Sequence, residues 1–206
     1  MESIIGINKD KYIFKGKEYN IFNIRDLLSK LNKNRRIIIF NENIFIKKYK
    51  IGEKDLEKFI NEKIKEDFTN RNELLFHYDY RHKDQEVFLY SIKNVVSKEL
   101  YRNARSLEIK PVQFWVKNYL RKKNKIKDFL AIFKLNSIYY LVDVEEDIII
   151  KSYLSSNLDE LKEKLYDDSS KNKVIIKDSS LSELKLIKDF KEGKAGKILY
   201  EKIYKK

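Results

Sequence analysis

The chain has 206 residues, of which 42% are hydrophobic and 37% charged, with a formal net charge of +13 at pH 7. This composition allows a folded core and argues against a disordered chain. The sequence contains no cysteine, which excludes disulfides, zinc–thiolate sites and cysteine nucleophiles. No run approaches the length of a membrane span, and the first residues lack the pattern of a signal peptide, so we expect neither feature.

The positive charge invites a nucleic-acid interpretation, but the residue types behind it argue for another one. The chain has 37 Lys and only 8 Arg, and the lysines are interspersed with Asp and Glu along nearly the whole sequence. Recognition of phosphates and bases favours arginine forks and clustered patches. We therefore expect a solvated basic surface and no specific nucleic-acid partner, and we keep a basic nucleic-acid-binding protein as an alternative function.

Residues 1–42 combine short β-prone runs with one amphipathic helix. Strands are predicted at 4–7, 12–14 and 19–22. A helix with one apolar face follows, formed by Ile24, Leu27, Leu28 and Leu31. Asn23 is placed to cap this helix. Four consecutive apolar residues at 37–40 then predict a strand that is covered on both faces, which gives the order βββαβ.

The same order of elements returns in residues 123–206. Strands are predicted at 129–135, 138–144 and 148–154. Asn157 and Glu160 are placed as the capping box of a helix that turns leucines inward. A buried strand at 174–176 and a last helical region that begins at Ser180 complete the order βββαβα. Two such units in one chain predict an internal duplication.

Between the two units, residues 43–122 predict an inserted subdomain of order βαββαβ. A strand at 43–51 precedes an amphipathic helix whose apolar face is Leu56, Phe59, Ile60, Ile64 and Phe68. A hairpin of two alternating strands turns at 81–85. A second helix over 94–108 and a strand over 109–116 follow, and Pro111 favours an edge position or a strand start.

Two βββαβα halves resemble the core of the actin-like, ribonuclease-H-like superfamily, and the inserted α/β subdomain resembles the FtsA-related variant. Within residues 36–120 the sequence is similar to the PilM/GspL family, the actin-like cytoplasmic components of type IV pilus and type II secretion assembly platforms. The positions that carry this similarity are Asp79-Tyr80, Leu89-Tyr90 and the return segment Leu107-Glu108-Ile109-Lys110-Pro111. We therefore expect a degenerate actin-like α/β fold with a duplicated core. Its parts are a first half at 1–42, an inserted subdomain at 43–122, and a second, truncated half with a C-terminal helix at 123–206.

The resemblance also indicates where a nucleotide would bind. Actin-like proteins hold ATP phosphates in two hairpins, one per half, where glycine lets backbone amides approach and an aspartate positions the metal. Here Asn8 stands about where the aspartate belongs, the step at 9–10 lacks glycine, and the second hairpin at 133–137 has neither acid nor glycine. Gly193 and Gly196 stand apart in a predicted lysine-rich helical segment, so the adenosine-binding Gly-Gly pair is missing too. We expect no cofactor, with an ATP-binding actin-like ATPase or switch as the alternative.

Two clusters of ionisable residues are the remaining candidates for a site. The first is His77, Asp79, His82, Asp84 and Glu86, and the second is Asp143, Glu145, Glu146 and Asp147. Neither has a known metal-site spacing, and no Ser-His-Asp set, HExxH or phosphate-loop motif occurs. We predict a half-exposed strand with an aromatic inner face at the first cluster and a solvated turn at the second. We therefore expect no catalytic residue and no bound metal.

The resemblance implies a non-catalytic scaffold at the cytoplasmic face of the inner membrane. Its expected partners are an inner-membrane platform protein of a pilus or secretion system, bound in the cleft between the inserted subdomain and the first half, and the motor ATPase. Lys202, Lys205 and Lys206 fit a C-terminal surface helix. The resemblance offers the alternative that they lie near the membrane, because basic residues flank the cytoplasmic ends of transmembrane helices. The sequence leaves open a homodimer, the partner-binding residues and whether a longer membrane-anchored chain continues beyond these lysines.

Overall fold

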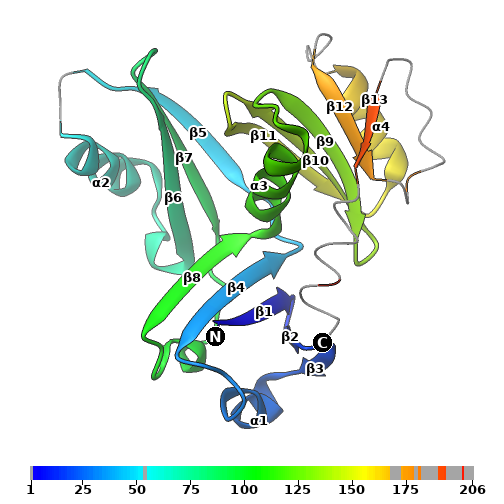
Figure 1. The fold of residues 1–206 in the computed structure, drawn as a ribbon. Coiled ribbons are helices and arrows are strands. Elements are labelled where there is room, and N and C mark those ends of the chain that lie inside the picture. The colour runs from blue at the N-terminus through cyan, green and yellow to red at the C-terminus, as the bar shows by residue number, and fades with distance from the viewer. Residues whose placement is uncertain are drawn as a thin grey trace.

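The computed structural model describes residues 2–52, 55–167, 173–178, 181, 190–193 and 201. These residues form two five-stranded sheets and one three-stranded sheet (Figure 1). No helix among them is long and apolar enough to cross a membrane. The helix expected from Ser180, Gly196 and the three lysines Lys202, Lys205 and Lys206 lie outside the described residues.

The first five-stranded sheet is built from both ends of the first half and from a strand far along the chain. Its strands are β1 (Glu2–Asn8), β2 (Lys11–Phe14), β3 (Lys17–Tyr19), β4 (Asn34–Phe40) and β8 (Ser106–Pro111), in the order β3-β2-β1-β4-β8. β1, β2 and β3 form an antiparallel meander. β4 pairs in parallel with β1, and β8 pairs in parallel with β4. α1 (Ile24–Leu28) connects β3 to β4, and α3 (Val112–Asn124) follows β8. The apolar run at 37–40 is fully covered, as predicted.

The second five-stranded sheet repeats this plan. Its elements are β9 (Phe129–Leu135), β10 (Ile138–Glu145), β11 (Ile148–Ser155), α4 (Leu158–Asp167), β12 (Val174–Asp178) and β13 (Phe190–Gly193). The order β11-β10-β9-β12-β13 matches the first sheet strand for strand, with the same antiparallel and parallel pairings. This confirms the duplicated core. The helix expected around Gly193 is wrong at that residue, because Gly193 ends β13, which pairs in parallel with β12.

The inserted part forms its own small sheet with one helix on it. β5 (Phe45–Lys50), α2 (Leu56–Asp67), β6 (Leu74–Arg81) and β7 (Glu86–Lys93) give the sheet order β5-β7-β6. Asp55 caps α2 by accepting from the amides of Glu57 and Lys58. The predicted apolar face of α2 packs on Val87 and Leu89 of β7. The helix and the hairpin at 81–85 are therefore confirmed.

The elements predicted for residues 94–116, the C-terminal part of the insertion, are wrong. Instead of a helix over 94–108 there is a 3₁₀ turn (Lys98–Tyr101) followed by β8, and β8 joins the first sheet beside β4. Instead of a strand over 109–116, the strand stops at Pro111 and α3 begins at Val112. Proline cannot donate a ladder hydrogen bond and is well placed at a helix start, so it ends the one element and opens the other.

Two smaller expectations in the first half are also corrected. The strand expected at 19–22 is a 3₁₀ turn (Ile21–Asn23), because Asn20 accepts hydrogen bonds from the amides of Phe22 and Asn23. The Asn23 side-chain oxygen accepts a hydrogen bond from the Asn20 backbone amide at 2.6 Å. Asn23 therefore does not cap α1 with its side chain. In the second half Asn157 does cap α4, whereas Glu160 accepts from the hydroxyl of Ser155 at 2.6 Å.

One continuous hydrophobic core joins the three parts. It contains Ile5 and Phe40 of the first half, Phe88 of the inserted sheet, and Phe114 of α3 with Phe133 of the second half. α3 lies in the middle, between the inserted sheet and the second five-stranded sheet (Figure 1). The helix is therefore the common packing partner of the two halves and the insertion.

Candidate functional site

The two hairpins that would hold phosphates keep their tight turns without glycine. Lys9 between β1 and β2 has φ 56°, and Asn136 and Ser137 between β9 and β10 have φ 49° and 65°. Glycine adopts such left-handed conformations without strain, and asparagine tolerates them better than most residues. Both turns therefore use left-handed residues that carry side chains in place of glycine.

A tyrosine of the second half reaches the end of the first sheet. Tyr140 of β10 is fully buried, and its ring stacks on Phe133 at 4.8 Å between centroids and 4° between planes. Its hydroxyl accepts from the backbone amide of Asn41 at 3.1 Å and donates to the Asn41 side-chain oxygen at 3.1 Å. The Asn41 side-chain amide in turn donates to Asn8. The carboxyl ends of β1 and β4 are thus tied to the second half by this Tyr140 cluster, made of Asn8, Asn41, Phe133 and Tyr140.

The sequence pointed to Asn8 but not to its partners. Asn41 directly follows the buried strand β4, where a parallel sheet places its functional residues. Tyr140 stands in a continuous apolar run of β10, a pattern that indicates burial and says nothing about which strand end its hydroxyl reaches.

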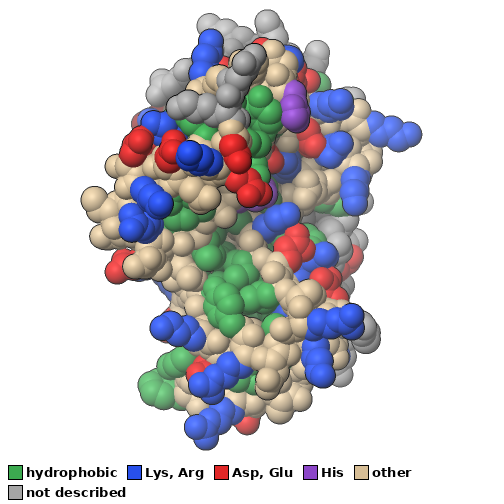
Figure 2. Space-filling model, turned by 90° about the vertical axis from the view of Figure 1, so that its left-hand side faces the viewer, with side chains coloured by type: hydrophobic (Ala, Val, Ile, Leu, Met, Phe, Trp, Pro, Cys, Tyr) green, Lys and Arg blue, Asp and Glu red, His purple; other side chains and the backbone are tan. Residues whose placement is uncertain are grey.

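A second feature is a narrow cleft between the inserted sheet and the first half, with a volume of about 30 Å³, called here the β6–β8 cleft. Its lining is apolar except for one histidine and one lysine: Leu75, Phe76, His77, Tyr90, Ile92, Ile109, Lys110, Pro111 and Phe114. β6 and β8 are the outer strands of their sheets, so each presents an edge that pairs with no other strand among the described residues. Figure 2 shows this face of the molecule, where hydrophobic side chains gather in a central hollow surrounded by charged ones.

Next to this cleft lies a partly buried polar group around Asp79, whose side chain is 25% exposed. The Tyr90 hydroxyl donates to Asp79 at 3.0 Å, and His77 Nε2 and Lys117 Nζ lie 3.7 and 3.9 Å from its carboxylate. Lys117 also donates to the backbone oxygen of Asp147 at 2.6 Å. Burial lowers the pKa of Lys117 and of His77, and the negative charge of Asp79 opposes both shifts. Phe76 and Tyr80 of β6 pack against the apolar face of α2, which confirms the predicted aromatic inner face.

The lowered pKa of His77 predicts a pH dependence of stability. Because folding favours the neutral imidazole, this contribution is fully present above the ordinary value of 6.5 and is lost as the pH falls through the lower pKa of the folded state. Thermal unfolding measured from about pH 7.5 to about pH 5 should show a smaller loss for His77→Gln than for the unchanged protein. His82→Gln controls for the change of residue type, and equal slopes for His77→Gln and the unchanged protein would contradict the prediction.

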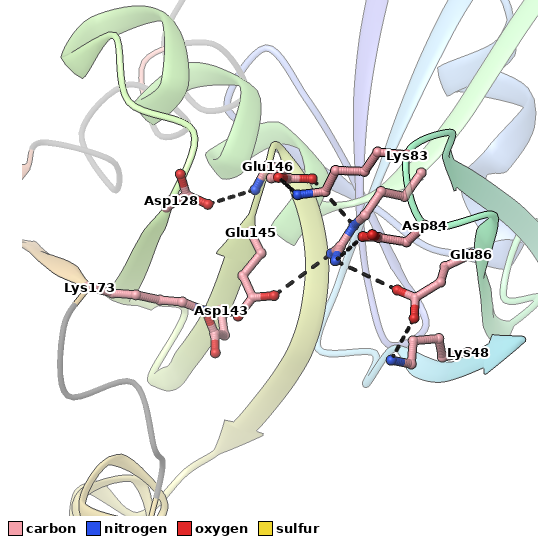
Figure 3. Close-up of polar contacts among 10 residues, drawn as sticks. Lys48, Lys83, Asp84, Glu86, Asp128, Asp143, Glu145, Glu146 and Lys173 are labelled. Atoms are coloured by element: carbon pink, nitrogen blue, oxygen red, sulfur yellow. Dashed lines mark hydrogen bonds and ion pairs between the residues drawn. The ribbon is translucent and has the colours of Figure 1, made fainter. Parts of the chain in front are cut away.

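The two acidic clusters of the sequence meet in space around Arg81. The guanidinium lies 3.5 Å from Asp84, 3.6 Å from Glu86, 3.7 Å from Glu145 and 3.6 Å from Glu146. These five side chains are called the Arg81 cluster. They come from the β6–β7 hairpin and from the end of β10 with its following turn, and they converge between the inserted sheet and the second half (Figure 3).

Three lysines extend the Arg81 cluster at its rim. Lys48 binds Glu86 at 3.1 Å, Lys83 pairs with Glu146, and Lys173 pairs with Glu145 at 2.7 Å and with Asp143. Burial by itself lowers the pKa of Lys173, but its hydrogen bonds to Asp143 and Glu145 outweigh burial and raise it. The expected solvated turn is wrong for Asp143, which lies in β10 and is only 2% exposed, whereas Glu146 in the turn is exposed.

The other predicted residues lie apart from the Arg81 cluster. His82 packs its ring on Tyr80 at 4.4 Å, and Asp147 pairs with Arg121 at 2.5 Å. No group of three or more potential metal ligands is present among the described residues. The arrangement is chemically an ion-pair junction, because every carboxylate in it faces a cation of the chain itself.

Comparison with known proteins adds the fold relationship. No family model and no curated protein matches this sequence. A protein of unknown function with an actin-like ATPase fold from Bacteroides thetaiotaomicron superposes with TM-score 0.52 at 10% identity, covering 86% of this chain and 80% of that one. The cytoplasmic domain of EpsL, an inner-membrane component of the type II secretion system of Vibrio cholerae, gives TM-score 0.56 at 6% identity, covering 94% and 85%.

A type IV pilus biogenesis complex, PilM–PilN, is a third similar structure, with TM-score 0.47, 11% identity and coverage of 81% and 66%. The first two comparisons establish the fold relationship. The chain therefore has the actin-like fold, and one of these two neighbours is an inner-membrane component of a type II secretion system.

Proposed function

We propose that the protein is a non-catalytic adaptor of a pilus- or secretion-type assembly platform at the cytoplasmic face of the inner membrane. Its β6–β8 cleft would bind a segment of a membrane-anchored platform protein. The observation that carries the proposal is this apolar cleft flanked by two unpaired strand edges, since such edges can accept an added strand and apolar pockets select its side chains. The fold neighbours, among them an inner-membrane secretion component, support the assignment.

The Tyr140 cluster supports the non-catalytic part of the proposal. A buried aromatic ring and its two hydrogen bonds to Asn41 occupy the junction of the two halves, next to hairpins that lack glycine. We expect calorimetric titration with ATP and Mg²⁺ to give no saturable heat. Saturable binding would contradict this part and would favour a nucleotide-gated switch.

The cleft itself is tested by one substitution. Ile109→Glu places a carboxylate among the apolar lining residues, and burying it unpaired is costly. We expect the yield of the co-purified platform protein to fall at least about tenfold, which corresponds to about 1.4 kcal/mol. The measurement is affinity purification of the tagged chain from its native cells, with partners identified by mass spectrometry.

The matched control is Ile21→Glu. Ile21 is 54% exposed on the turn before α1, outside the cleft, so this variant makes the same chemical change without touching the lining. Thermal unfolding of both variants separates lost binding from lost fold. Recovery of no inner-membrane assembly component, or equal yields from both variants, would overturn the proposal.

A further inference from the structure

A groove on the opposite edge of the inserted sheet carries a second inference, which is independent of the proposed function. This β5–β11 groove has a volume of about 450 Å³. It is lined by Asn43, Ile44, Phe45, Ile46, Leu141, Asp143, Ile150, Lys151, Ser152, Tyr153 and Lys164. The residues come from the start of β5, from β10 and β11, and from α4, so the groove runs between the inserted sheet and the second half.

Both strands beside the groove present unpaired edges. β5 is the outer strand of the inserted sheet and β11 the outer strand of the second sheet, and among the described residues no ladder joins them. In Figure 1 the two strands face each other across the middle of the molecule. The Ser152 hydroxyl is buried beside the groove and has no hydrogen-bond partner within the described part of the chain. Buried polar groups are rarely left in this state, so a further partner for this edge is expected.

The charged residues that line the groove indicate which charge a partner should carry. Asp143 is 2% exposed, and its carboxylate pairs with Lys173, which also binds Glu145. The other charged lining residues are Lys151 and Lys164, and the chain as a whole carries +13. Phe45 adds an apolar ring that is 55% exposed at the mouth. A positive, partly apolar groove attracts an acidic partner and repels a second copy of this basic chain.

We propose that β11 binds, as an added strand, an extended segment of a partner protein in which acidic and apolar side chains alternate. Side chains of a strand point alternately to opposite faces. Acidic side chains on one face would meet Lys151 and Lys164, while apolar side chains on the other would contact Phe45 and Ile46. The main chain of the segment would pair with the free edge of β11.

The test is selection from a phage-displayed library of random twelve-residue peptides on the full chain. We expect the enriched peptides to alternate acidic and apolar residues and, in hydrogen exchange, to protect amides of residues 148–155. Lys164→Glu replaces attraction by repulsion at the rim and should weaken binding of the selected peptide about fivefold to tenfold. Lys58→Glu, on the exposed side of α2 and away from the groove, is the matched control and should leave the affinity unchanged.

Each other outcome overturns the proposal. These are no enrichment, enriched peptides without acidic residues, protection of β6 or β8 in place of β11, and equal weakening by Lys58→Glu. Protection of β11 that depends on protein concentration without peptide would assign the groove to a second copy. Ile109→Glu should leave peptide binding unchanged, so that failure here is distinguished from failure of the β6–β8 cleft.

Discussion

Tyr140→Ala is expected to lower the free energy of unfolding by about 3–5 kcal/mol, the usual cost of truncating a large buried aromatic residue. The side chain is fully buried and stacks on Phe133, so little relaxation can fill the space. The same change removes both hydrogen bonds to Asn41, which connect the second half to the end of β4. We therefore expect loss of stability together with loosening between the halves.

The measurement is equilibrium unfolding in urea, with two companion variants. Tyr140→Phe keeps the ring and deletes only the hydroxyl, so it should cost about 1–3 kcal/mol, the penalty for leaving a buried partner unsatisfied. Tyr101→Ala is the matched control, because Tyr101 is 40% exposed and its truncation should cost below about 1 kcal/mol. A cost for Tyr140→Ala as small as that of Tyr101→Ala would contradict the packing described for the Tyr140 cluster.

The elements of the two repeated units could be predicted because their local patterns agree with their tertiary surroundings. The strand predicted at 129–135 matches β9, and the run at 37–40 lies in β4, which is covered on both faces. α2 has an N-cap residue, an apolar stripe and a length of 12 residues, and all three favour a helix. Such elements can be predicted from the sequence because their local preference agrees with their tertiary environment.

Residues 94–116 could not be predicted from their pattern, because tertiary contacts decide their structure. Val96 and Leu100 have helical spacing, but they are buried by a short turn whose Leu100 oxygen accepts from Arg35 at 2.8 Å. The side chains of Asn94 and Ser97 accept bonds from nearby amides, which competes with helix formation. The β-branched and aromatic residues after Pro111 favour a strand, yet they cover the main core as a helix.

The candidate sites were visible only in part for a related reason. Each acidic cluster can be seen in the sequence, but their meeting at Arg81 joins hairpins that are more than sixty residues apart, as in the pair Lys83–Glu146 with a separation of 63. The order of strands in a sheet fixes such meetings, and no local pattern encodes it. For the same reason Asn41 and Tyr140, 99 residues apart, gave no signal as partners.

Arg81→Met is expected to lower the free energy of unfolding by about 2–4 kcal/mol, because it leaves the four carboxylates of the Arg81 cluster without their common cation. The Arg81 side chain is 13% exposed and that of Glu86 10%, whereas those of Glu145 and Glu146 are about 40% exposed, so solvent screens part of the effect. Methionine retains most of the packing of the side-chain stem on Phe88, over which the guanidinium lies at 4.9 Å. The decrease in the free energy of unfolding therefore comes mainly from removal of the guanidinium charge.

Urea unfolding at increasing NaCl checks the electrostatic origin of this loss. Salt screens both the attraction in the unchanged protein and the repulsion in the variant, so the difference between them should shrink. Arg102→Met is the matched control, since Arg102 is 75% exposed and pairs only with Glu99 among the described residues. It should cost below about 0.5 kcal/mol.

A third variant tests whether the charge of Arg81 acts on the carboxylates of the second half. Adding Glu145→Gln and Glu146→Gln to Arg81→Met removes the repulsion that the second half exerts on the inserted hairpin, and it should restore part of the lost stability. Restoration would mean that the Arg81 cluster holds the inserted sheet against the second half across the junction. No restoration, together with a loss that salt does not change, would place the effect in packing on Phe88 and would contradict an ionic junction.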